Sequence, residues 1–390
     1  MTRPARVMHV VPWPVYGGPH NEALLIGMNA DRKGWSLTTV LPQDGRAAAR
    51  RLETQGLRVV QLPMTRLRRT RSLSYWACYP ANFLVDVYRL ARLMGRDRIL
   101  LVEGSSVNLQ PAIAARISGA AVVWRVADIS APALIRRAIG LLVPFLADAV
   151  LVNGRATLPA YPGLSRAAGR LSIYYPMIDD SAFNDMVLTP RVRGTEPVVG
   201  MVANINPDKG IEVFVEAAGL LAGRREVRFI LVGAEHDTHR AYARRIRERV
   251  LELGLEDRFE FAGEQSNVGG WMRRMDVFVI SSHREGTTTT AIEAMASSLP
   301  VVATMVGAVG EVVADGKTGL LVPPANPSAL AAAVALLLDD DAYRRRLALE
   351  GRKRFEEHFA LAGALSERMA AYRRAVARMK RRRHIKRPSQ

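Results

Sequence analysis

The segment VFVISSHREGTTTTAIEAMASSLPVVAT, Val277–Thr304, is the most informative part of the sequence for the fold. A short apolar run, a polar loop, a helix-like segment and a second apolar run follow one another. Strand, helix and strand in this order form the repeating unit of a parallel sheet. Threonine is a middling-to-poor helix former, so the four threonines at 287–290 predict a weak helix start. Glu285 before this start and Glu293 within the helix raise the question of what it binds.

Short apolar runs alternate with longer amphipathic segments along the rest of the chain. The runs are RVMHVVP, SLTTVLP, LRVVQLP, RILLVEG, AVVWRVAD, AVLVNG and RLSIYYP, then VVGMVANI, VRFILVG, FEFAG, VFVISS, PVVAT and GLLVP. Many are apolar at consecutive positions, as parallel strands buried on both faces are. The pattern lapses over Met177–Pro197, which is polar and contains Pro and Gly. The sequence therefore predicts two α/β domains, each a doubly wound parallel sheet.

We place the domain boundaries where this pattern changes. A first Rossmann-like domain is predicted over 1–176, a linker over 177–196 and a second Rossmann-like domain over 197–358. A C-terminal helix over 359–379 and a basic tail over 380–390 follow, and Ser328 is a candidate N-cap within the second domain. In open parallel sheets, ligands lie outside the carboxyl ends of the strands. Two such sheets in tandem predict a substrate site in a cleft between the domains.

Composition narrows the class of protein. The 390 residues are 49% apolar and 24% charged, which is the balance of a soluble globular protein. Cys78 is the only cysteine, so an intrachain disulfide is excluded, and nothing in the sequence resembles a zinc-ligand pattern. The apolar part of the N-terminus is short and broken by prolines, unlike a signal peptide. No apolar stretch reaches the roughly 18 residues of a membrane span, so we expect a cytoplasmic protein, with peripheral attachment to the inner face of the membrane as an option.

The net charge of +18 is unevenly distributed. Residues 1–185 hold 23 Lys and Arg against 12 Asp and Glu, residues 186–378 hold 26 against 25, and the last twelve residues hold 6 against none. Such a field attracts anionic surfaces. Arg66, Arg68, Arg69 and Arg71 also precede the aromatic stretch SYWACYPANF. An anionic membrane is therefore an expected partner of the first domain and tail, with a core-facing helix and a solvated basic rim as the alternative. The tail lacks aromatic residues for base stacking, so nucleic acid is not expected.

Two loops between strand and helix could approach an anion. Gly17 and Gly18 follow the first strand, and without Cβ atoms their amides can approach a phosphate or sugar closely. This loop is not a dinucleotide-binding fingerprint, and a plain turn is the alternative. Lys209 precedes Gly210 in the first loop of the second sheet, where its ammonium group would meet an anion at the helix start. A solvated surface lysine is the alternative here.

The segment 286–289 is predicted to lie at the helix N-terminus, where its N–H groups are unpaired. At a rise of ~1.5 Å per residue, Glu285 and Glu293 lie up to ~12 Å apart. That is too far for a shared proton, and too far for the carboxyl pair of a retaining glycosidase, ~5 Å apart. The spacing suits two carboxylates that accept hydrogen bonds from hydroxyls at opposite ends of one elongated ligand, with its phosphates on the amides between them.

The segment from Glu285 to Asp340, beginning EGTTTTAIEAMASSLPVVATMVGAVGE, resembles the donor-binding half of retaining glycosyltransferases of family 4 (glycosyl transferases group 1), which have the GT-B fold. Glu285 and Glu293 match the family's pair of glutamates. ANINPDKG, residues 203–210, resembles its phosphate-binding loop, and the Gly17–Gly18 loop resembles its N-terminal one. The likeness covers nearly all of the second domain, whereas in the first domain it is mostly architectural.

The resemblance implies transfer of a sugar from a UDP- or GDP-sugar to a glycan or lipid-linked acceptor, with retention of configuration, in cell-surface polysaccharide or glycolipid synthesis. Glu285 would hold hydroxyls of the donor sugar, and Glu293 those of the ribose. Lys209 would neutralise the leaving diphosphate. Gly286, Thr287, Thr288 and Thr289 would offer donor-binding amides. No metal or other cofactor is expected.

Several positions depart from the family pattern. Asn204 stands where an arginine is usual, which removes one diphosphate cation unless Arg125 or Arg284 replaces it. The residues at 286–288 read Gly-Thr-Thr in place of Gly-Phe-Gly. The usual histidine of the first domain is missing from VVWRVADIS, where Asp128 is the candidate acceptor contact or catalytic base and a helix cap is the alternative.

Other histidines and other functions stay open. His9 lies on a predicted buried strand and is expected in the core, while His20 and His283 could line the substrate site. An epimerase of similar architecture would need further acid and base groups, and a phosphorylase would need a lysine context for its cofactor. A non-catalytic glycan or polyanion binder is a further alternative, and Asn204 and the missing histidine are its best support.

Overall fold

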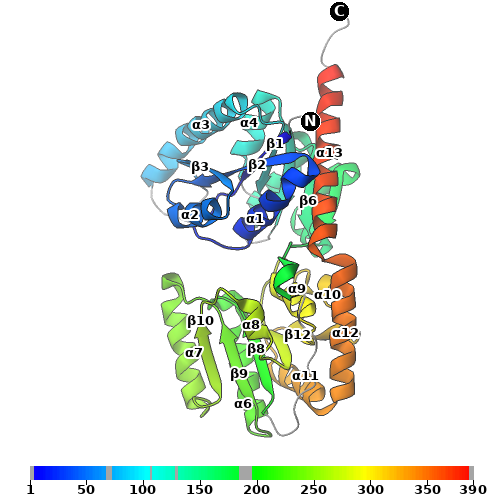
Figure 1. The fold of residues 1–390 in the computed structure, drawn as a ribbon. Coiled ribbons are helices and arrows are strands. Elements are labelled where there is room, and N and C mark those ends of the chain that lie inside the picture. The colour runs from blue at the N-terminus through cyan, green and yellow to red at the C-terminus, as the bar shows by residue number, and fades with distance from the viewer. Residues whose placement is uncertain (1–3, 67–72, 106–107, 128–130, 184–195, 386–390) are drawn as a thin grey trace, which may run out of the picture. The chain divides into compact units, whose positions relative to one another are not determined.

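A computed structural model describes residues 4–66, 73–105, 108–127, 131–183 and 196–385. The chain divides into two units, which are described separately (Figure 1). Unit 1 comprises Met1–Met177 and Ala362–Gln390, and unit 2 comprises Ile178–Leu361. The C-terminal segment therefore belongs to the unit formed by the N-terminal half of the chain.

Unit 1 is built on a parallel sheet of seven strands in the order β3-β2-β1-β4-β5-β6-β7. The strands are β1 (Ala5–Val10), β2 (Trp35–Pro42), β3 (Arg58–Leu62), β4 (Leu101–Ser105), β5 (Ala121–Val126), β6 (Ala149–Asn153) and β7 (Leu171–Tyr174). All six pairings are parallel. The strand order reverses between β1 and β4, which makes the sheet doubly wound and places its switch point beside the loop that follows β1. Every residue of β5 and β6 is buried, which explains why both strands are apolar except for Arg125 and Asn153.

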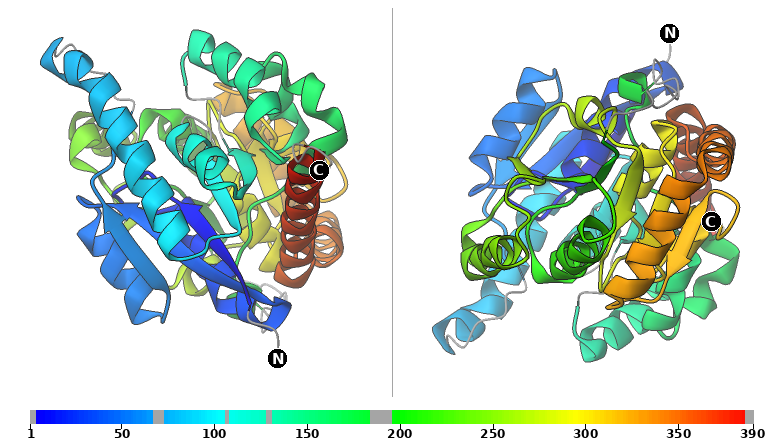
Figure 2. Two further views of the ribbon diagram at one scale, coloured as in Figure 1. Left: turned by 90° about the horizontal axis from the view of Figure 1, so that it is seen from above. Right: turned by 90° about the horizontal axis from the view of Figure 1, so that it is seen from below.

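The helices of unit 1 cover the two faces of this sheet. They are α1 (Gly18–Ala30), α2 (Arg46–Thr54), α3 (Leu73–Arg96), α4 (Gln110–Ser118), α5 (Ala133–Leu146) and most of α13 (Leu361–Ile385). Helix α4 packs against both α3 and α5. The first half of α3 reaches beyond the other elements of the unit (Figure 2). On α13, the Tyr372 ring meets the Trp35 ring edge-on, with centroids 5.5 Å apart.

Unit 2 has a second parallel sheet, with six strands in the order β10-β9-β8-β11-β12-β13. The strands are β8 (Val198–Val202), β9 (Arg228–Val232), β10 (Phe259–Gly263), β11 (Val277–Ile280), β12 (Val301–Thr304) and β13 (Gly319–Val322). The helices are α6 (Ile211–Ala222), α7 (Arg240–Glu252), α8 (Val268–Met272), α9 (Thr289–Ala296), α10 (Val309–Val312), α11 (Pro327–Asp339) and α12 (Asp341–His358). Here the strand order reverses between β8 and β11, so this sheet is doubly wound too.

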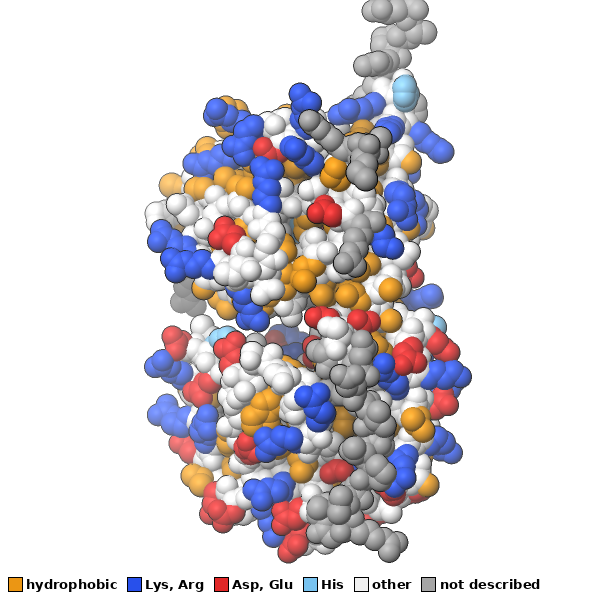
Figure 3. Space-filling model, viewed as in Figure 1, with side chains coloured by type: hydrophobic (Ala, Val, Ile, Leu, Met, Phe, Trp, Pro, Cys, Tyr) orange, Lys and Arg blue, Asp and Glu red, His pale blue; other side chains and the backbone are white. Residues whose placement is uncertain are grey.

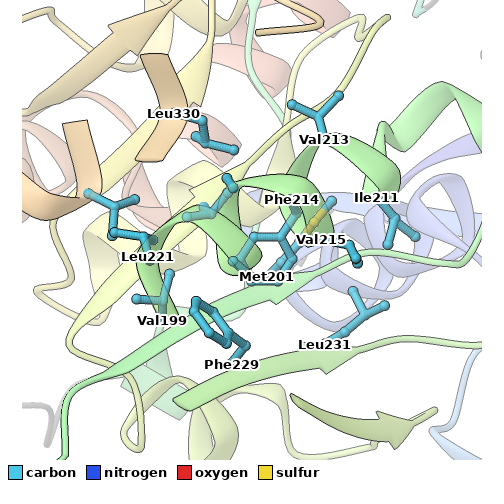
Figure 4. Packing of buried hydrophobic residues seen from close by; sticks show 14 of the residues in the cluster. Val199, Met201, Ile211, Val213, Phe214, Val215, Leu221, Phe229, Leu231 and Leu330 are labelled. Carbon is cyan, nitrogen blue, oxygen red and sulfur yellow. The ribbon is translucent and has the colours of Figure 1, made fainter. Parts of the chain in front are cut away.

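The core of unit 2 forms where α6 lies on the sheet (Figure 4). Phe214 of α6 meets Phe229 of β9 edge-on, with ring centroids 6.1 Å apart. Val199 and Met201 of β8 lie beneath the same helix. These side chains remove a large apolar area from water and hold the loop between β8 and α6 at the carboxyl edge of the sheet.

The structure confirms the predicted fold class of two doubly wound parallel sheets, since the described residues form all thirteen predicted strands. Three local predictions need correction. Helix α9 begins at Thr289 with Thr288 as its N-cap, so Gly286 and Thr287 precede it. Helix α11 is capped by Asn326 and not by Ser328, because the Asn326 side chain accepts a hydrogen bond from the Ala329 amide. Helix α13 extends to Ile385, into the predicted tail.

Other predictions stand outside what the structure describes. Most of the predicted linker, residues 184–195, lies outside the described residues, and the cleft between the domains stays a prediction. None of the described helices combines the length and the apolar character needed to span a bilayer.

Candidate functional site

Two loops meet at the switch point of the sheet in unit 2, one after β8 and one after β11. Lys209 lies in the first loop and Glu285 in the second, and Lys209 Nζ is 2.7 Å from Glu285 Oε1. The Ser282 hydroxyl donates to the same oxygen at 2.8 Å. The Glu285 side chain is 9% exposed and that of Lys209 is 30% exposed. The structure thus brings the two predicted residues together and adds Ser282, which the sequence analysis missed.

Two further contacts join the same loops. Arg284 pairs with Asp208 at 3.0 Å, and the Asp208 carbonyl accepts from the His283 amide at 2.9 Å. Glu212, at the start of α6, is 2.6 Å from His283 Nε2 and also accepts from the Tyr242 hydroxyl. Burial alone would raise the pKa of Glu212, but these two hydrogen bonds outweigh it and hold the pKa below its ordinary value. These contacts therefore hold the two loops together.

Glycine is required at two positions that lie against the backbone of the loop after β11. Gly210 has a φ of +57°, and a Cβ there would overlap the carbonyl oxygen of Ser281. Gly307 has a φ of +53°, and a Cβ there would overlap the carbonyl oxygen of Glu285. The Ala308 amide donates to the Gly286 carbonyl at 2.8 Å from the same turn. Close backbone approach thus fixes the loop that carries Glu285.

The two ends of helix α9 differ in their hydrogen bonding. At its start, the Thr288 hydroxyl accepts from the Ala291 amide at 3.4 Å. The amides of Thr289 and Thr290 have no acceptor within the described part of the chain. A helix start with open amides attracts an anion.

Glu293, in the same helix, is partly buried, and its carboxyl group has no hydrogen bond or ion pair to any described residue. Burial raises its pKa to about 7. A buried carboxyl group without a partner costs free energy unless a ligand satisfies it. This is a second, independent sign of a ligand at α9.

Asn204 lies at the exposed start of the loop after β8. Its side-chain oxygen accepts from the Ala234 amide at 3.2 Å, which joins this loop to the one after β9. The two residues considered as replacements for the missing arginine are both engaged. Arg284 pairs with Asp208, and Arg125 is buried in unit 1, where it pairs with Glu22.

The Gly17–Gly18 loop lies in unit 1. Gly17 caps α1 in an extended conformation, and a Cβ on either glycine would meet no atom within 4 Å. The chain itself therefore does not demand glycine here, and the open space beside the loop is available to a ligand. His20 is buried behind it, with Nε2 3.1 Å from the Trp13 carbonyl. The third catalytic candidate, Asp128, lies outside the described residues.

A buried charged cluster lies under the same loop. Arg368 of α13 donates to Glu22 of α1 and, at 2.5 Å, to Glu103 of β4. The Tyr372 hydroxyl donates to Glu103 at 2.6 Å. Burial alone would raise the pKa of Glu103, but Arg368 and its other partners hold it below the ordinary value. His9 is in the core as expected, and burial lowers its pKa to about 3.

Within the part of the chain that the structure describes, no three His, Cys, Asp or Glu side chains are arranged to hold a metal ion.

Comparisons with known proteins agree with this architecture. The fold matches a glycosyltransferase from Rickettsia africae with a TM-score of 0.81 and 18% identity, over 96% of this chain and 99% of that one. It matches Anabaena HepE in complex with UDP with a TM-score of 0.78 and 20% identity, over 94% and 98%. With the two parallel-sheet units, these matches define the fold as GT-B.

Residues 189–354, which lie within unit 2, match the family Glycosyl transferases group 1. The chain is 34% identical over 183 residues to the lipopolysaccharide core biosynthesis mannosyltransferase LpsB of Rhizobium meliloti, covering 45% of this chain and 52% of that protein. It is 35% identical over 191 residues to the D-inositol 3-phosphate glycosyltransferase of Corynebacterium glutamicum, covering 46% and 44%. The chain thus spans about half the length of the curated relatives it matches.

Proposed function

We propose that the protein is a retaining glycosyltransferase of family 4, which transfers a sugar from a nucleoside diphosphate sugar to a glycan or lipid-linked acceptor. The observation that carries the proposal is that three features occur together in unit 2. They are the open amides at the start of α9, the partly buried, unpaired carboxyl group of Glu293 on the same helix, and the Lys209–Glu285 pair in the loops beside it. The mannosyltransferase and inositol phosphate glycosyltransferase relatives support the reaction class. The UDP and UDP-glucose complexes of HepE support the donor class.

In this proposal the diphosphate of the donor lies on the amides of Thr289 and Thr290. Lys209 is partly exposed, so its ammonium group can exchange Glu285 for a phosphate oxygen. Glu285, released from the lysine but still held by Ser282, then accepts hydroxyls of the sugar. Lys209 stabilises the negative charge that develops on the leaving diphosphate. Glu293 accepts the ribose hydroxyls, which removes the cost of its unpaired burial.

We also propose that no metal takes part, because Lys209 and the helix start carry the charge that a divalent cation would otherwise neutralise. Asn204 in place of arginine leaves Lys209 as the main cation of this role. Transfer activity in the presence of excess EDTA tests this point. Activity that disappears with EDTA and returns with Mg²⁺ or Mn²⁺ would contradict it.

The test of the reaction is sugar release and transfer from a panel of UDP- and GDP-sugars. We expect Lys209→Ala to lower kcat by about 10²–10³, the usual effect of removing a group that stabilises a developing anion. Glu285→Gln should lower kcat while nucleotide affinity is retained, because Glu285 contacts the sugar. Arg274→Gln is a matched control, since Arg274 forms an exposed pair with Glu260 at the sheet edge. A wild-type protein that binds no nucleotide would leave only a non-catalytic binder.

We further propose that unit 1 works on an anionic membrane surface at the inner face of the membrane. The chain from Ser72 to Val85 contains no charged residue. On α3, the side chains of Leu73, Leu84 and Tyr88 are 85%, 68% and 65% exposed. On α5, Leu134 and Phe145 are 79% and 74% exposed. Exposed apolar groups of this density mark an interaction surface.

Charge supports the same surface. Arg89 and Arg92 follow the uncharged half of α3, and Lys and Arg outnumber acidic side chains over the visible face of unit 1, whereas both signs mix over unit 2 (Figure 3). Apolar and aromatic groups next to arginines suit the headgroup level of a bilayer. The contribution of the tail is smaller than its sequence suggests. Arg382 pairs with Asp148 at 2.9 Å and Arg383 donates to the Gly119 carbonyl, so both anchor α13 to unit 1.

Co-sedimentation with vesicles of anionic or zwitterionic lipid tests the surface. We expect binding to anionic vesicles that weakens with salt, and a loss of about tenfold or more for Trp76→Ser with Leu84→Ser, since two apolar side chains leave the interface. Removal of residues 386–390 should have less effect than these two substitutions. Equal binding to both kinds of vesicle, or none, would contradict the proposal.

A further inference from the structure

The C-terminal end of α9 is fully hydrogen-bonded. The carbonyls of Glu293, Ala294 and Met295 accept from the amides of the next turn at 2.9, 2.9 and 3.1 Å. The carbonyl of Ala296 accepts from Arg352 Nη1 at 2.5 Å. Arg352 belongs to α12 and lies 56 residues further along the chain. The last carbonyl of the proposed donor helix is therefore satisfied by a distant arginine.

Arg352 holds a second carbonyl with the same nitrogen. Nη1 also donates to the Phe183 carbonyl at 3.2 Å, so each of its two hydrogens has an acceptor. The guanidinium is fixed from behind by Glu356, whose carboxylate accepts from Arg352 Nε at 2.6 Å. The Arg352 side chain is 21% exposed, so water competes only partly for these bonds. A cation at a helix C-terminus is also favoured by the helix dipole.

The second carbonyl belongs to the segment through which the chain enters unit 2. Unit 2 begins at Ile178 and ends at Leu361, and the short helical turn Asp180–Phe183 lies between Ile178 and the undescribed residues. The Asp180 carboxylate accepts from the Leu361 amide at 3.2 Å. The entering and leaving segments of unit 2 are thus tied together, and Arg352 connects them to α9.

We infer that Arg352 is a positioning residue for donor binding, because its side chain donates hydrogen bonds both to the last carbonyl of α9 and to the segment through which the chain enters unit 2. The inference rests on the proposed function, since it takes the start of α9 as the nucleotide site. Thr289, Thr290 and Glu293 all lie on α9, so a shift of this helix would displace all three. A nucleotide that orders the start of the helix should therefore also order the Asp180–Leu361 contact, and the coupling must act in both directions.

The experiment measures UDP and GDP affinity by titration calorimetry, and amide hydrogen exchange of residues 358–363 with and without nucleotide. We expect Arg352→Met to weaken nucleotide binding about tenfold and to raise KM for the donor more than it lowers kcat, because α9 is misplaced while Lys209 and Glu285 stay in place. In the wild type, nucleotide should slow exchange at Leu361, and in Arg352→Met this effect should disappear. Arg352→Lys should restore part of the affinity, since an ammonium group can reach one carbonyl.

Arg344→Gln is the matched control. Arg344 lies on the same helix and pairs at 3.1 Å with Asp276, at the amino edge of the sheet, away from the proposed site. This variant should lose thermal stability without a change in KM or in the exchange response. Unchanged nucleotide affinity and exchange in Arg352→Met, with normal wild-type binding, would overturn the inference alone. A wild type that binds no nucleotide would overturn the proposed function and, with it, this inference.

Discussion

At the residue scale, two properties of the Glu293 side chain together lower the stability of the folded protein when no ligand is bound. Its carboxyl group is withdrawn from water, yet no described group donates to it. Lys209 and Glu285 differ from it, since they satisfy each other. In the proposed function, a bound nucleotide sugar would recover the stability that the unpaired carboxyl group of Glu293 costs.

The prediction at this scale concerns pH. The pKa of Glu293 is 4.5 when unfolded and about 7 when folded, so the folded state keeps its proton between these values while the unfolded state releases it. The contribution of Glu293 to stability therefore falls as pH rises from 4.5 to 7. We expect Glu293→Gln to increase the free energy of unfolding by about 1–3 kcal/mol at pH 8 and to change it little at pH 4. Urea denaturation at the two pH values measures this, and a loss of stability at pH 8 would contradict it.

The affinity for nucleotide should increase as pH rises, whereas the contribution of Glu293 to stability falls. The ionised carboxylate can accept two hydroxyl hydrogen bonds, whereas the protonated group accepts fewer. We expect wild-type affinity to increase as pH rises through about 7, and that of Glu293→Gln to be weaker and to increase less steeply over this range. Calorimetric titration from pH 6 to pH 8.5 distinguishes the two. A wild-type affinity that falls with pH would contradict the proposed role of Glu293.

At the scale of the element, α9 shows how a sequence with a poor start still forms a helix. Thr288 provides the N-cap and uses its hydroxyl on the Ala291 amide. The next turn and Arg352 satisfy the C-terminal carbonyls. The threonine run is therefore tolerated because one threonine caps and tertiary contacts hold the other end. The open amides of Thr289 and Thr290 are what this arrangement leaves for a ligand.

Substitution of the cap tests this account. Thr288→Ala should lower the free energy of unfolding by about 1 kcal/mol, the typical value of an N-cap hydrogen bond, while Thr288→Ser should restore it. Chemical denaturation of the wild type and the two variants gives the order directly. A Thr288→Ala protein as stable as the wild type would show that the cap does not stabilise α9.

At the scale of the whole molecule, α13 completes unit 1 with charged groups as well as apolar ones. Without Arg368, Arg125 would be the one arginine left beside the buried Glu22 and Glu103 among the described residues. Loss of one partner from a buried ion-pair network typically costs about 3–5 kcal/mol, because the remaining charge stays out of water. We expect Arg368→Met to lower the free energy of unfolding of unit 1 by this amount.

The double variant Arg368→Met with Glu103→Gln provides the control. Once the facing charge is also removed, the combined loss should be smaller than the sum of the single losses by about 1–3 kcal/mol. Strictly additive losses would show that the two side chains do not interact in solution.

The sequence predicted the elements much better than their contacts. All thirteen strands were predictable because buried parallel strands need continuous apolar runs. The Lys209 loop and the Glu285–Glu293 spacing were also readable, since each lies next to a strand end. The cap at Asn326 was missed because Ser328 is an equally good cap by residue type, and only the backbone distinguishes them. Arg352 and Arg368 carried no signal, because arginine is ordinary on a helix surface.

Local sequence determined the strands and helices, the parallel pairing of the strands and the spacing of the two glutamates. These features follow from hydrophobic periodicity and from the residue types that can lie at the end of a strand. Tertiary structure decided the rest. Arg368 meets Glu103 and Glu22 across 265 and 346 residues, and Lys209 meets Glu285 across 76. Pairings at such separations depend on how the sheets wind and where α13 packs, and no local pattern encodes them. The physical reason is that burial, and not residue type, determines which charged side chains have a partner and which one, Glu293, has none among the described residues.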